Sequence, residues 1–282
     1  MDFTKVQSVG NDFVLIEASK NKRDWSSLAK NICSRHFGVG ADGLLVLFPS
    51  NDADFRMRIF NSDGTEAEAC GNGLRCLVNY VHQKRIHSGD HMTVETMAGI
   101  RNAEIKVEGE GTKIRIGMGL PVFETSNIPV VVEKGQAKQI CNMTTEYPLN
   151  VRDIQLSLSF VSMGNPHAVH FNNYPVTEFP LDVYGPLVEN AAIFPVHTNF
   201  EVVRVIQPDK IEMRVWERGV GETLACGSGA CAVAVASWIL GYTGSKVDIK
   251  LPGGLLQAEW DGYNEVFLTG KAEIVFFGVW QQ

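Results

Sequence analysis

Hydrophobic and polar residues alternate along much of the chain in short segments. Alternation with a period of two is typical of half-buried β-strands. It recurs in seven segments: Phe55–Phe60, Met92–Thr96, Ile114–Ile116, Leu156–Phe160, Ile211–Trp216, Val247–Leu251 and Glu265–Leu268. Turn-forming sequences such as NSDG at 61–64 and PGG at 252–254 separate these segments. The pattern predicts a fold dominated by short strands.

Three stretches change to the period of a helix. The first is expected to begin with Ser26 as its N-cap and to stop at Gly38. Each of the other two follows a Cys-Gly-x-Gly sequence. Leu74–Lys84 is apolar on one face, whereas Ala230–Leu240 is apolar on nearly every side, which is typical of a helix enclosed by other elements.

The chain also repeats itself. FRMRIFNSDGTEAEACGNG at 55–73 aligns with IEMRVWERGVGETLACGSG at 211–229, an offset of 156 residues, and SVGN at 8–11 aligns with SMGN at 162–165. Self-similarity at nearly one offset indicates two copies of one structural unit. We therefore predict an α+β fold of two pseudo-symmetric domains. Each would be a curled, mixed or antiparallel β-sheet wrapped around a central helix, and Pro121–Glu133 would pass between them.

Composition narrows the class of protein. With 282 residues, 45% of them hydrophobic, the chain is expected to form one or two globular domains. The 25 Lys and Arg against 32 Asp and Glu give a net charge of −7. Because no basic cluster is present, we expect neither a nucleic-acid nor a membrane partner. The N-terminal residues do not resemble a signal peptide, so a cytoplasmic protein is expected.

The two Cys-Gly-x-Gly sequences, beginning at Cys70 and Cys226, stand where a loop becomes a helix. The first N–H groups of a helix have no acceptor within it and carry about half a unit of positive charge. Such an end binds a carboxylate and is expected to lower the pKa of a cysteine. If the halves pack about a pseudo-twofold axis, the two sulfurs would flank one substrate α-carbon. One, as thiolate, would remove the α-proton, and the other, as thiol, would return a proton to the opposite face.

Other interpretations of the cysteines remain open at this point. A free cysteine is often a small buried hydrophobe, which is our preferred interpretation of Cys33, Cys76, Cys141 and Cys231 and the alternative for Cys70 and Cys226. A zinc site is disfavoured because the spacings are C-x5-C and C-x4-C. We expect no metal and no cofactor. A disulfide between Cys70 and Cys226 is a further alternative.

Polar residues occupy matching places in the two copies. The duplication aligns Asn11 with Asn165 and Asn61 with Glu217, which Arg218 follows. Amides and an Arg–carboxylate pair are suited to hold a second amino-acid head. Each Asn taken alone is more typical of a turn. The Glu–Arg pair taken alone is more often found on a solvated surface. His167 either assists a thiol or is simply satisfied within the sheet.

Seven motifs, in order along essentially the whole chain, closely resemble diaminopimelate epimerase. They are GNDF (10–13), FNSDG (60–64), ACGNG (69–73), GNPH (164–167), TNFE (198–201), ERGVGET (217–223) and ACGSG (225–229). The resemblance implies a cofactor-independent isomerase. It would interconvert LL- and meso-2,6-diaminopimelate in lysine and peptidoglycan precursor biosynthesis. It also implies a small-molecule substrate and a homodimer.

The resemblance assigns site residues as well. The catalytic cysteines match Cys70 and Cys226, with His167 and Glu217 as possible assistants. Substrate-contacting positions match Asn11, Asn61, Asn165, Asn199, Glu217 and Arg218, and backbone donors match Gly71, Asn72, Gly227 and Ser228. The expected domains are 1–120 plus 271–282, and 121–270. Gly43 stands where many members carry Gln, so one side-chain contact near the substrate is missing.

Three competing functions remain. A proline racemase or hydroxyproline epimerase has the same architecture and two cysteines but needs no receptor for a distal amino-acid head. A phenazine-type isomerase lacks the cysteine pair, and a non-catalytic amino-acid-binding protein needs no thiols. Glu217, Arg218 and the asparagines favour diaminopimelate.

Overall fold

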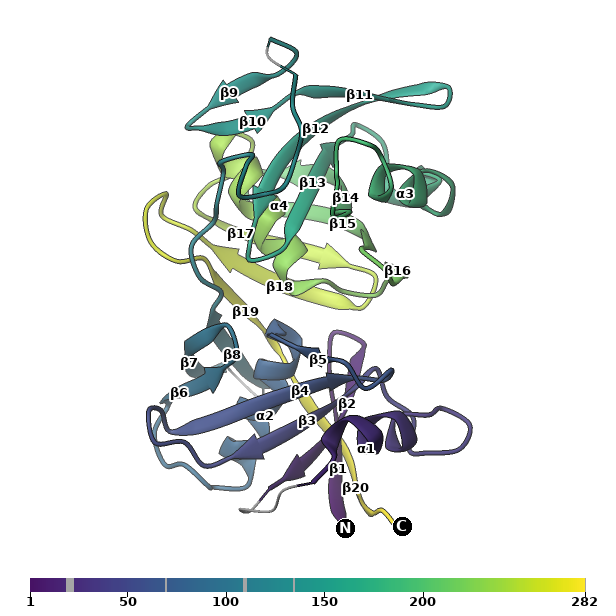
Figure 1. The fold of residues 1–282 in the computed structure, drawn as a ribbon. Helices are drawn as coiled ribbons and strands as arrows, with labels where there is room; N and C mark the ends of the chain where they lie inside the picture. The colour runs from purple at the N-terminus through teal and green to yellow at the C-terminus, as the bar shows by residue number, and fades with distance from the viewer. Residues whose placement is uncertain (19–22, 69, 109–110, 134, 282) are drawn as a thin grey trace. The chain divides into compact units, whose positions relative to one another are not determined.

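The computed structural model describes residues 1–18, 23–68, 70–108, 111–133 and 135–281 (Figure 1). They form two compact units: Met1–Gly117 together with Thr269–Gln282, and Met118–Leu268. Ala69 of the ACGNG motif lies outside the described residues. Each unit is a curved mixed sheet that encloses one helix, which confirms the predicted α+β class.

The first unit has nine strands and two helices within the described residues. They are β1 (Asp2–Ser8), β2 (Asn11–Glu17), α1 (Trp25–Ile32), β3 (Gly43–Phe48), β4 (Phe55–Asn61), β5 (Glu66–Ala67), α2 (Gly71–Gln83), β6 (His91–Thr96), β7 (Gly99–Glu108), β8 (Gly111–Gly117) and β20 (Glu273–Val279). The strand order is β20-β1-β2-β3-β4-β6-β7-β8, with β5 beside β4. The parallel pairs β2/β3 and β4/β6 are those that α1 and α2 connect, as crossover connections require.

The second unit repeats this topology. Its elements are β9 (Lys138–Ile140), β10 (Met143–Thr145), β11 (Tyr147–Val151), β12 (Ile154–Ser162), β13 (Pro166–Phe171), η1 (Val176–Glu178), α3 (Leu181–Glu189), β14 (Asn199–Gln207), β15 (Lys210–Glu217), β16 (Gly221–Thr223), α4 (Gly227–Ile239), β17 (Lys246–Leu251) and β18 (Gly254–Glu259). The strand order is β11-β12-β13-β14-β15-β17-β18, with β16 beside β15 and parallel pairs at β13/β14 and β15/β17. β19 (Phe267–Lys271) then leads back to the first unit.

Each sheet has a helix on both faces, so its central strands are buried on both sides. In the first unit, Leu44 and Val46 of β3 pack with α1 in one apolar cluster, whereas Leu45 lies against the first turn of α2. Figure 1 shows α2 and α4 inside their curved sheets. β3 therefore reads as a continuous apolar run, whereas β4 and β15 alternate. No helix within the described ranges is both long and apolar enough to span a membrane.

Helix boundaries differ from the sequence prediction in two places. Asp24, not Ser26, caps α1 by accepting the N–H of Ser27 at 3.0 Å, and the helix ends at Ile32 rather than near Gly38. The second difference is α3, which has no counterpart in the prediction. Its sequence LDVYGPLVE has Gly and Pro in the interior, and both disfavour helices. A Cβ on Gly185 would stand 2.5 Å from the Trp216 ring, so tight packing requires the glycine.

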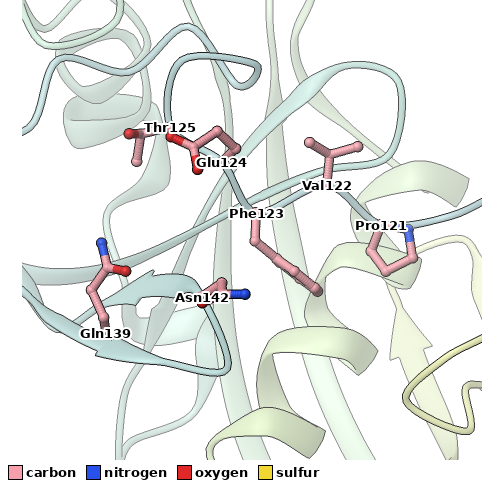
Figure 2. Close-up of a pocket in the computed structure, with 7 residues that line it drawn as sticks. All are labelled: Pro121, Val122, Phe123, Glu124, Thr125, Gln139 and Asn142. Carbon is pink, nitrogen blue, oxygen red and sulfur yellow. The ribbon is translucent and has the colours of Figure 1, made fainter.

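Cys141 is exposed, so the expectation that it fills a core is wrong. It forms, with Asn142, the two-residue loop between β9 and β10, and both residues have positive φ as such hairpins require. Cys33, Cys76 and Cys231 are buried as expected, and burial raises the pKa of Cys33 to about 12. A polar pocket of about 360 Å³ lies between this hairpin and the segment 121–125 (Figure 2), and no predicted site residue lines it.

Candidate active site

The predicted site residues gather at one edge of each sheet. In the first unit Asn11 begins β2, Gly43 begins β3 and Asn61 ends β4, and Gly43 lies directly opposite Asn61 in register. In the second unit Asn199 begins β14 and Glu217 ends β15, so the same strand ends are used. The parallel pairing of Phe13 with Gly43 and of His167 with Asn199 fixes these positions as equivalents.

Cys70 is the N-cap of α2, and its sulfur replaces the usual capping oxygen. Sγ accepts the N–H of Gly73 at 3.5 Å and lies 3.9 Å from Oδ1 of Asn11. A helix offers no internal acceptor to its first N–H groups, here those of Gly71 and Asn72. The start of α2 therefore presents a sulfur and backbone donors together, which suits a reacting carbon that carries a carboxylate.

Buried side chains of α2 orient Asn11. Arg75 is fully buried, donates from Nε to Ser8 Oγ at 3.0 Å and bonds to Oδ1 of Asn72. This leaves the amide nitrogen of Asn72 to donate to Oδ1 of Asn11 at 3.1 Å. The oxygen of Asn11 therefore faces α2 and the sulfur of Cys70.

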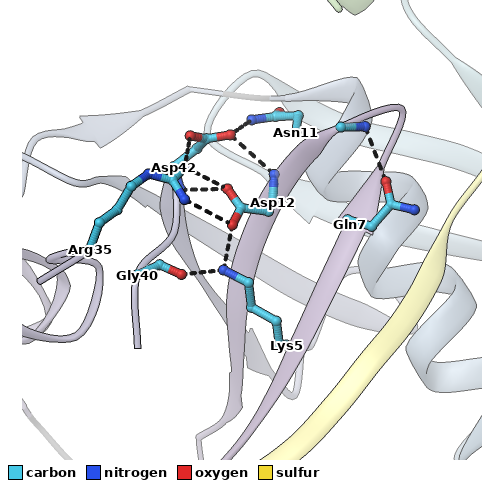
Figure 3. A network of polar contacts seen from close by, with 8 residues as sticks. Lys5, Gln7, Asn11, Asp12, Arg35, Gly40 and Asp42 are labelled. Carbon is cyan, nitrogen blue, oxygen red and sulfur yellow. Dashed lines mark hydrogen bonds and ion pairs between the residues drawn. The ribbon is translucent and has the colours of Figure 1, made fainter. Parts of the chain in front are cut away.

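The other end of the Asn11 amide joins a charged network at the sheet edge (Figure 3). Its nitrogen donates to Asp42 at 2.7 Å, and Arg35 joins Asp42 to Asp12 through contacts of 2.7 and 3.0 Å. Lys5 pairs with Asp12 at 2.5 Å. Burial alone would raise the pKa of Asp12, but Lys5 and Arg35 outweigh it and lower the pKa. The network gives the amide one orientation.

Asn61 and Gly43 complete this edge. Asn61 is exposed, and its amide nitrogen donates to Thr65 Oγ1 at 2.9 Å, closing the turn after β4. A Cβ on Gly43 would stand only 2.7 Å from the carbonyl oxygen of Phe60. The close approach of β3 and β4 therefore leaves no room for a side chain at position 43.

Cys226 caps α4 as Cys70 caps α2. Its sulfur accepts the N–H of Gly229 at 3.4 Å and lies 3.5 Å from Ser228 Oγ. The first N–H groups of α4 belong to Gly227 and Ser228, in the places that Gly71 and Asn72 take in α2. Cys226 is more deeply buried than Cys70, with 5% of its surface exposed.

Glu217 is the acidic neighbour of Cys226. Its carboxylate accepts a hydrogen bond from Oγ1 of Thr223 at 2.5 Å and also interacts with the Cys226 thiol. Burial raises the pKa of Glu217, and the hydrogen bonds from Thr223 and Cys226 reduce that rise. Glu217 is thus placed to exchange a proton with the thiol.

Asn199 and Arg218 hold the same edge together. Asn199 is buried, donates to the carbonyl of Pro166 at 2.8 Å and accepts the N–H of Arg218 at 3.0 Å. The Arg218 side chain is exposed and donates to the carbonyl of Val196 at 3.2 Å. In this structure Asn199 thus fixes the start of Arg218, while the guanidinium reaches solvent.

His167 lies in a buried polar chain that ends at Asn165. Its Nδ1 is 2.6 Å from Oε1 of Glu201, its Nε2 is 3.0 Å from Oδ1 of Asn165, and neither His167 nor Glu201 is exposed. A carboxylate on Nδ1 fixes the orientation of an imidazole ring. Glu201 therefore positions His167, and through it the amide of Asn165.

The pKa of Cys226 is raised well above its usual value, so the expectation that a helix start lowers it is wrong for this residue. Burial is the largest cause, followed by the charges of Glu217 and Glu201. The hydrogen bonds from Ser228 and from the Gly229 N–H favour the thiolate but are weaker. Cys226 is thus a protonated thiol at neutral pH.

Sequence analysis missed three residues that contact predicted site residues: Asp42, Arg75 and Glu201. Asp42 and Arg75 gave no signal, because each lies in an otherwise ordinary polar or helical context. Glu201 gave one: it is a charged residue at an inward position of FEVV, where the first copy has Leu45 in LLVL. A charge in a buried strand is rarely tolerated without a specific partner.

The fold is shared with several solved structures. A structure titled probable proline racemase, from Agrobacterium radiobacter, has a TM-score of 0.70 at 13% identity, covering 99% of this chain and 92% of that one. A phenazine biosynthesis protein of Bacillus anthracis has a TM-score of 0.68 at 16% identity, covering 99% and 98%. Identities this low establish a common fold only.

Curated relatives are much more similar. The enzymes named diaminopimelate epimerase from Carboxydothermus hydrogenoformans and Heliobacterium modesticaldum are 45% and 44% identical, each across 99% of this chain and 98–99% of their own. The one from Methanococcus maripaludis is 43% identical, with 99% of both chains covered. The sequence profile of the diaminopimelate epimerase family matches residues 3–124 and 159–275. Fold and relatives thus define an isomerase of the amino-acid epimerase class. The chain belongs to the diaminopimelate epimerase family.

Proposed function

We propose that this enzyme interconverts LL- and meso-2,6-diaminopimelate without a cofactor, with Cys70 and Cys226 as its acid–base pair. The observation that supports the proposal best is the matched capping of α2 and α4. Each sulfur accepts the N–H of the third helical residue, and two backbone donors precede that residue. The duplication thus supplies one thiol and one carboxylate-binding helix start per unit.

In this mechanism the thiolate of one cysteine takes the α-proton and becomes a thiol. The electron pair left on the α-carbon is delocalised onto the substrate carboxylate, where the helix N–H groups stabilise it. Preorganised donors of this kind contribute about 3–4 kcal/mol each. The second thiol then delivers its proton to the opposite face and becomes a thiolate. One turnover exchanges the roles of the sulfurs, and the reverse reaction restores them.

The remaining polar residues would bind the rest of the substrate. We assign Asn11, Asn61, Asn165, Asn199, Glu217 and Arg218 to substrate binding, with His167 and Glu217 supporting the cysteines. The exposed guanidinium of Arg218 suits a bidentate contact with a carboxylate. A substrate with a second amino-acid head needs such groups to bind it, whereas proline has no second head.

Cysteine substitutions test the mechanism directly. Cys70→Ala and Cys226→Ala should each lower kcat by at least about 100-fold, because general acid–base groups contribute about that much. Cys141→Ala is the matched control, since this exposed cysteine lies at a hairpin tip in the second unit. Activity of either active-site variant within tenfold of wild type would rule out the two-thiol mechanism.

Isotope and substrate experiments test the chemistry and the specificity. Turnover in deuterated water should place deuterium at the inverted α-carbon, and retention of the original hydrogen would contradict exchange through a thiol. Separate incubations with LL-diaminopimelate and L-proline, followed by optical rotation, should show inversion of the first alone. Inversion of L-proline would instead support the racemase alternative.

We further propose that the enzyme acts as a cytoplasmic homodimer in lysine and peptidoglycan precursor biosynthesis. The functional domains would be 1–120 plus 271–282, and 121–270. Light scattering of the eluted protein should give about twice the 31.1 kDa of the chain. A mass of one chain at working concentration would contradict the dimer.

A further inference from the structure

The two half-sites differ at one pair of equivalent positions directly beneath the capped helices. A Cβ on Gly73 would meet Leu45 Cδ2 at 3.0 Å, whereas a Cβ on Gly229 would meet Glu201 Oε1 at 2.8 Å. Leu45 and Glu201 occupy matching places in β3 and β14. The first turn of α2 therefore rests on a methyl group, and the first turn of α4 on a carboxylate.

Glu201 is fully buried, and its one side-chain hydrogen-bond partner within the described residues is His167. Oε1 lies 2.6 Å from His167 Nδ1, and Oε2 has no hydrogen-bond partner among the described residues. In the first unit Phe13 stands in the place of His167. The other favourable interaction open to this carboxylate is the positive potential at the start of α4, on which it lies.

Glu201 and Cys226 therefore share one helix start. The Cβ position at Gly229 that is 2.8 Å from Oε1 is also 3.4 Å from the Cys226 sulfur. A thiolate at Cys226 would add a second anion there, with Glu217 as a third. Like charges in a buried site disfavour ionisation of the last member. Interaction with His167 lowers the pKa of Glu217 and so opposes this effect. Burial and the charges of Glu217 and Glu201 nevertheless raise the pKa of Cys226.

The side chains around the start of α2 differ from those around the start of α4. Leu45 brings no charge to the start of α2, and the buried Arg75 reaches it through Asn72, whereas α4 has Cys231 in the place of Arg75. Lys5 and Arg35, which pair with Asp12 and Asp42, also lie at this edge. The exposed Glu68 precedes the cysteine in solvent. The start of α2 thus has a buried arginine nearby, whereas the start of α4 has a buried glutamate.

We propose, building on the two-cysteine mechanism above, that Glu201 is a positioning residue that keeps Cys226 as the resting thiol and leaves Cys70 to ionise first. The free enzyme then has its base at Cys70 and its acid at Cys226. The raised pKa of Cys226 agrees with this assignment.

Alkylation at a series of pH values tests the assignment without turnover. The protein is treated with iodoacetamide, and the rate at each cysteine is read by mass spectrometry, with the exposed Cys141 as internal reference. In the wild type the rate at Cys70 should rise at lower pH than the rate at Cys226. Glu201→Gln keeps an acceptor for His167 but removes the charge. It should lower the inflection at Cys226 by about one pH unit or more and leave that of Cys70 unchanged.

Glu212→Gln is the matched control, because it removes a carboxylate of β15 that pairs with Arg204 instead. It should move neither inflection. An unchanged Cys226 inflection in Glu201→Gln, or a wild type in which Cys226 reacts at lower pH than Cys70, would overturn the proposal. The wild-type comparison decides the order even if the variant does not fold. Failure here is separate from failure of the mechanism, since Cys226→Ala would still lower kcat by at least about 100-fold.

Discussion

Asn11 donates its amide nitrogen to Asp42 at 2.7 Å while its oxygen accepts the amide of Asn72 at 3.1 Å. An asparagine held at both ends cannot turn its amide over. The oxygen of Asn11 is therefore kept beside the sulfur of Cys70, 3.9 Å away.

Asp42→Ala should free the Asn11 amide and lower kcat/KM for diaminopimelate by about 10–100-fold, because small misplacements in a site carry such penalties. The fold should persist, since Arg35 keeps its contact with Asp12. Steady-state kinetics gives the measurement. Asp54→Ala is the control: it removes a carboxylate of the same unit that bonds to Thr93. A wild-type kcat/KM for Asp42→Ala would show that Asn11 needs no such support.

The Asp12 carboxylate should make stability depend on pH. Its pKa is lowered in the folded protein relative to about 3.9 in the unfolded chain. Its contribution is therefore present in full above the unfolded pKa and is lost as the pH falls through the folded pKa. Asp12→Asn should be less stable than wild type to urea at pH 7, and the difference should shrink below pH 4.

Asp52→Asn is the control for this comparison, because Asp52 is exposed and has no ion pair among the described residues. It should follow the wild type at both pH values. If the difference in unfolding free energy between Asp12→Asn and wild type stays constant with pH, ionisation of Asp12 does not stabilise the fold.

Gly43→Ala should destabilise the first unit by about 1–3 kcal/mol, the usual range for overpacking a tight contact. The added Cβ would stand 2.7 Å from the Phe60 carbonyl oxygen, which belongs to the backbone of β4 and cannot move alone. Gly244→Ala has no atom within 4 Å of the new Cβ and should be nearly neutral. Urea unfolding of both variants makes the comparison. Equal stabilities would show that β3 and β4 separate easily.

Leu77→Ala should destabilise the protein by about 2–5 kcal/mol, because Leu77 on α2 is fully buried and the truncation leaves a cavity. Leu255→Ala in β18 is the control, with the same atoms removed from a side chain that is 57% exposed. It should cost little. A small loss of stability in Leu77→Ala would mean that the sheet and helix move together to fill the cavity.

Patterns with a strong local cause were predictable from the sequence. Alternation located β4, β6 and β15, and the duplication located the starts of α2 and α4 at the two Cys-Gly-x-Gly sequences. The duplication also predicts α3. Because β13 and β14 match β2 and β3, a helix equivalent to α1 is expected between them. Local propensity concealed it, because Gly185 is required by the Trp216 ring rather than by the helix.

Long-range electrostatics could not be predicted in the same way. The helix-start argument applied equally to Cys70 and Cys226, yet burial and two carboxylates raise the pKa of Cys226. Which charges surround a thiol depends on strands distant in sequence, such as β13 and β14 with His167 and Glu201. The prediction that Cys141 is buried failed for a different reason. Cys141 and Asn142 form a two-residue hairpin loop, and their sequence is not one of the usual turn signals.

The pairing of β20 with β1 has a consequence for synthesis on the ribosome. β1 is made before the rest of the first unit, but its second antiparallel neighbour, β20, comes only with residues 273–279. The second unit is contiguous and can mature while the nascent chain is still growing. The N-terminal half must wait with an open sheet edge, which makes it the segment that chaperones would be expected to protect.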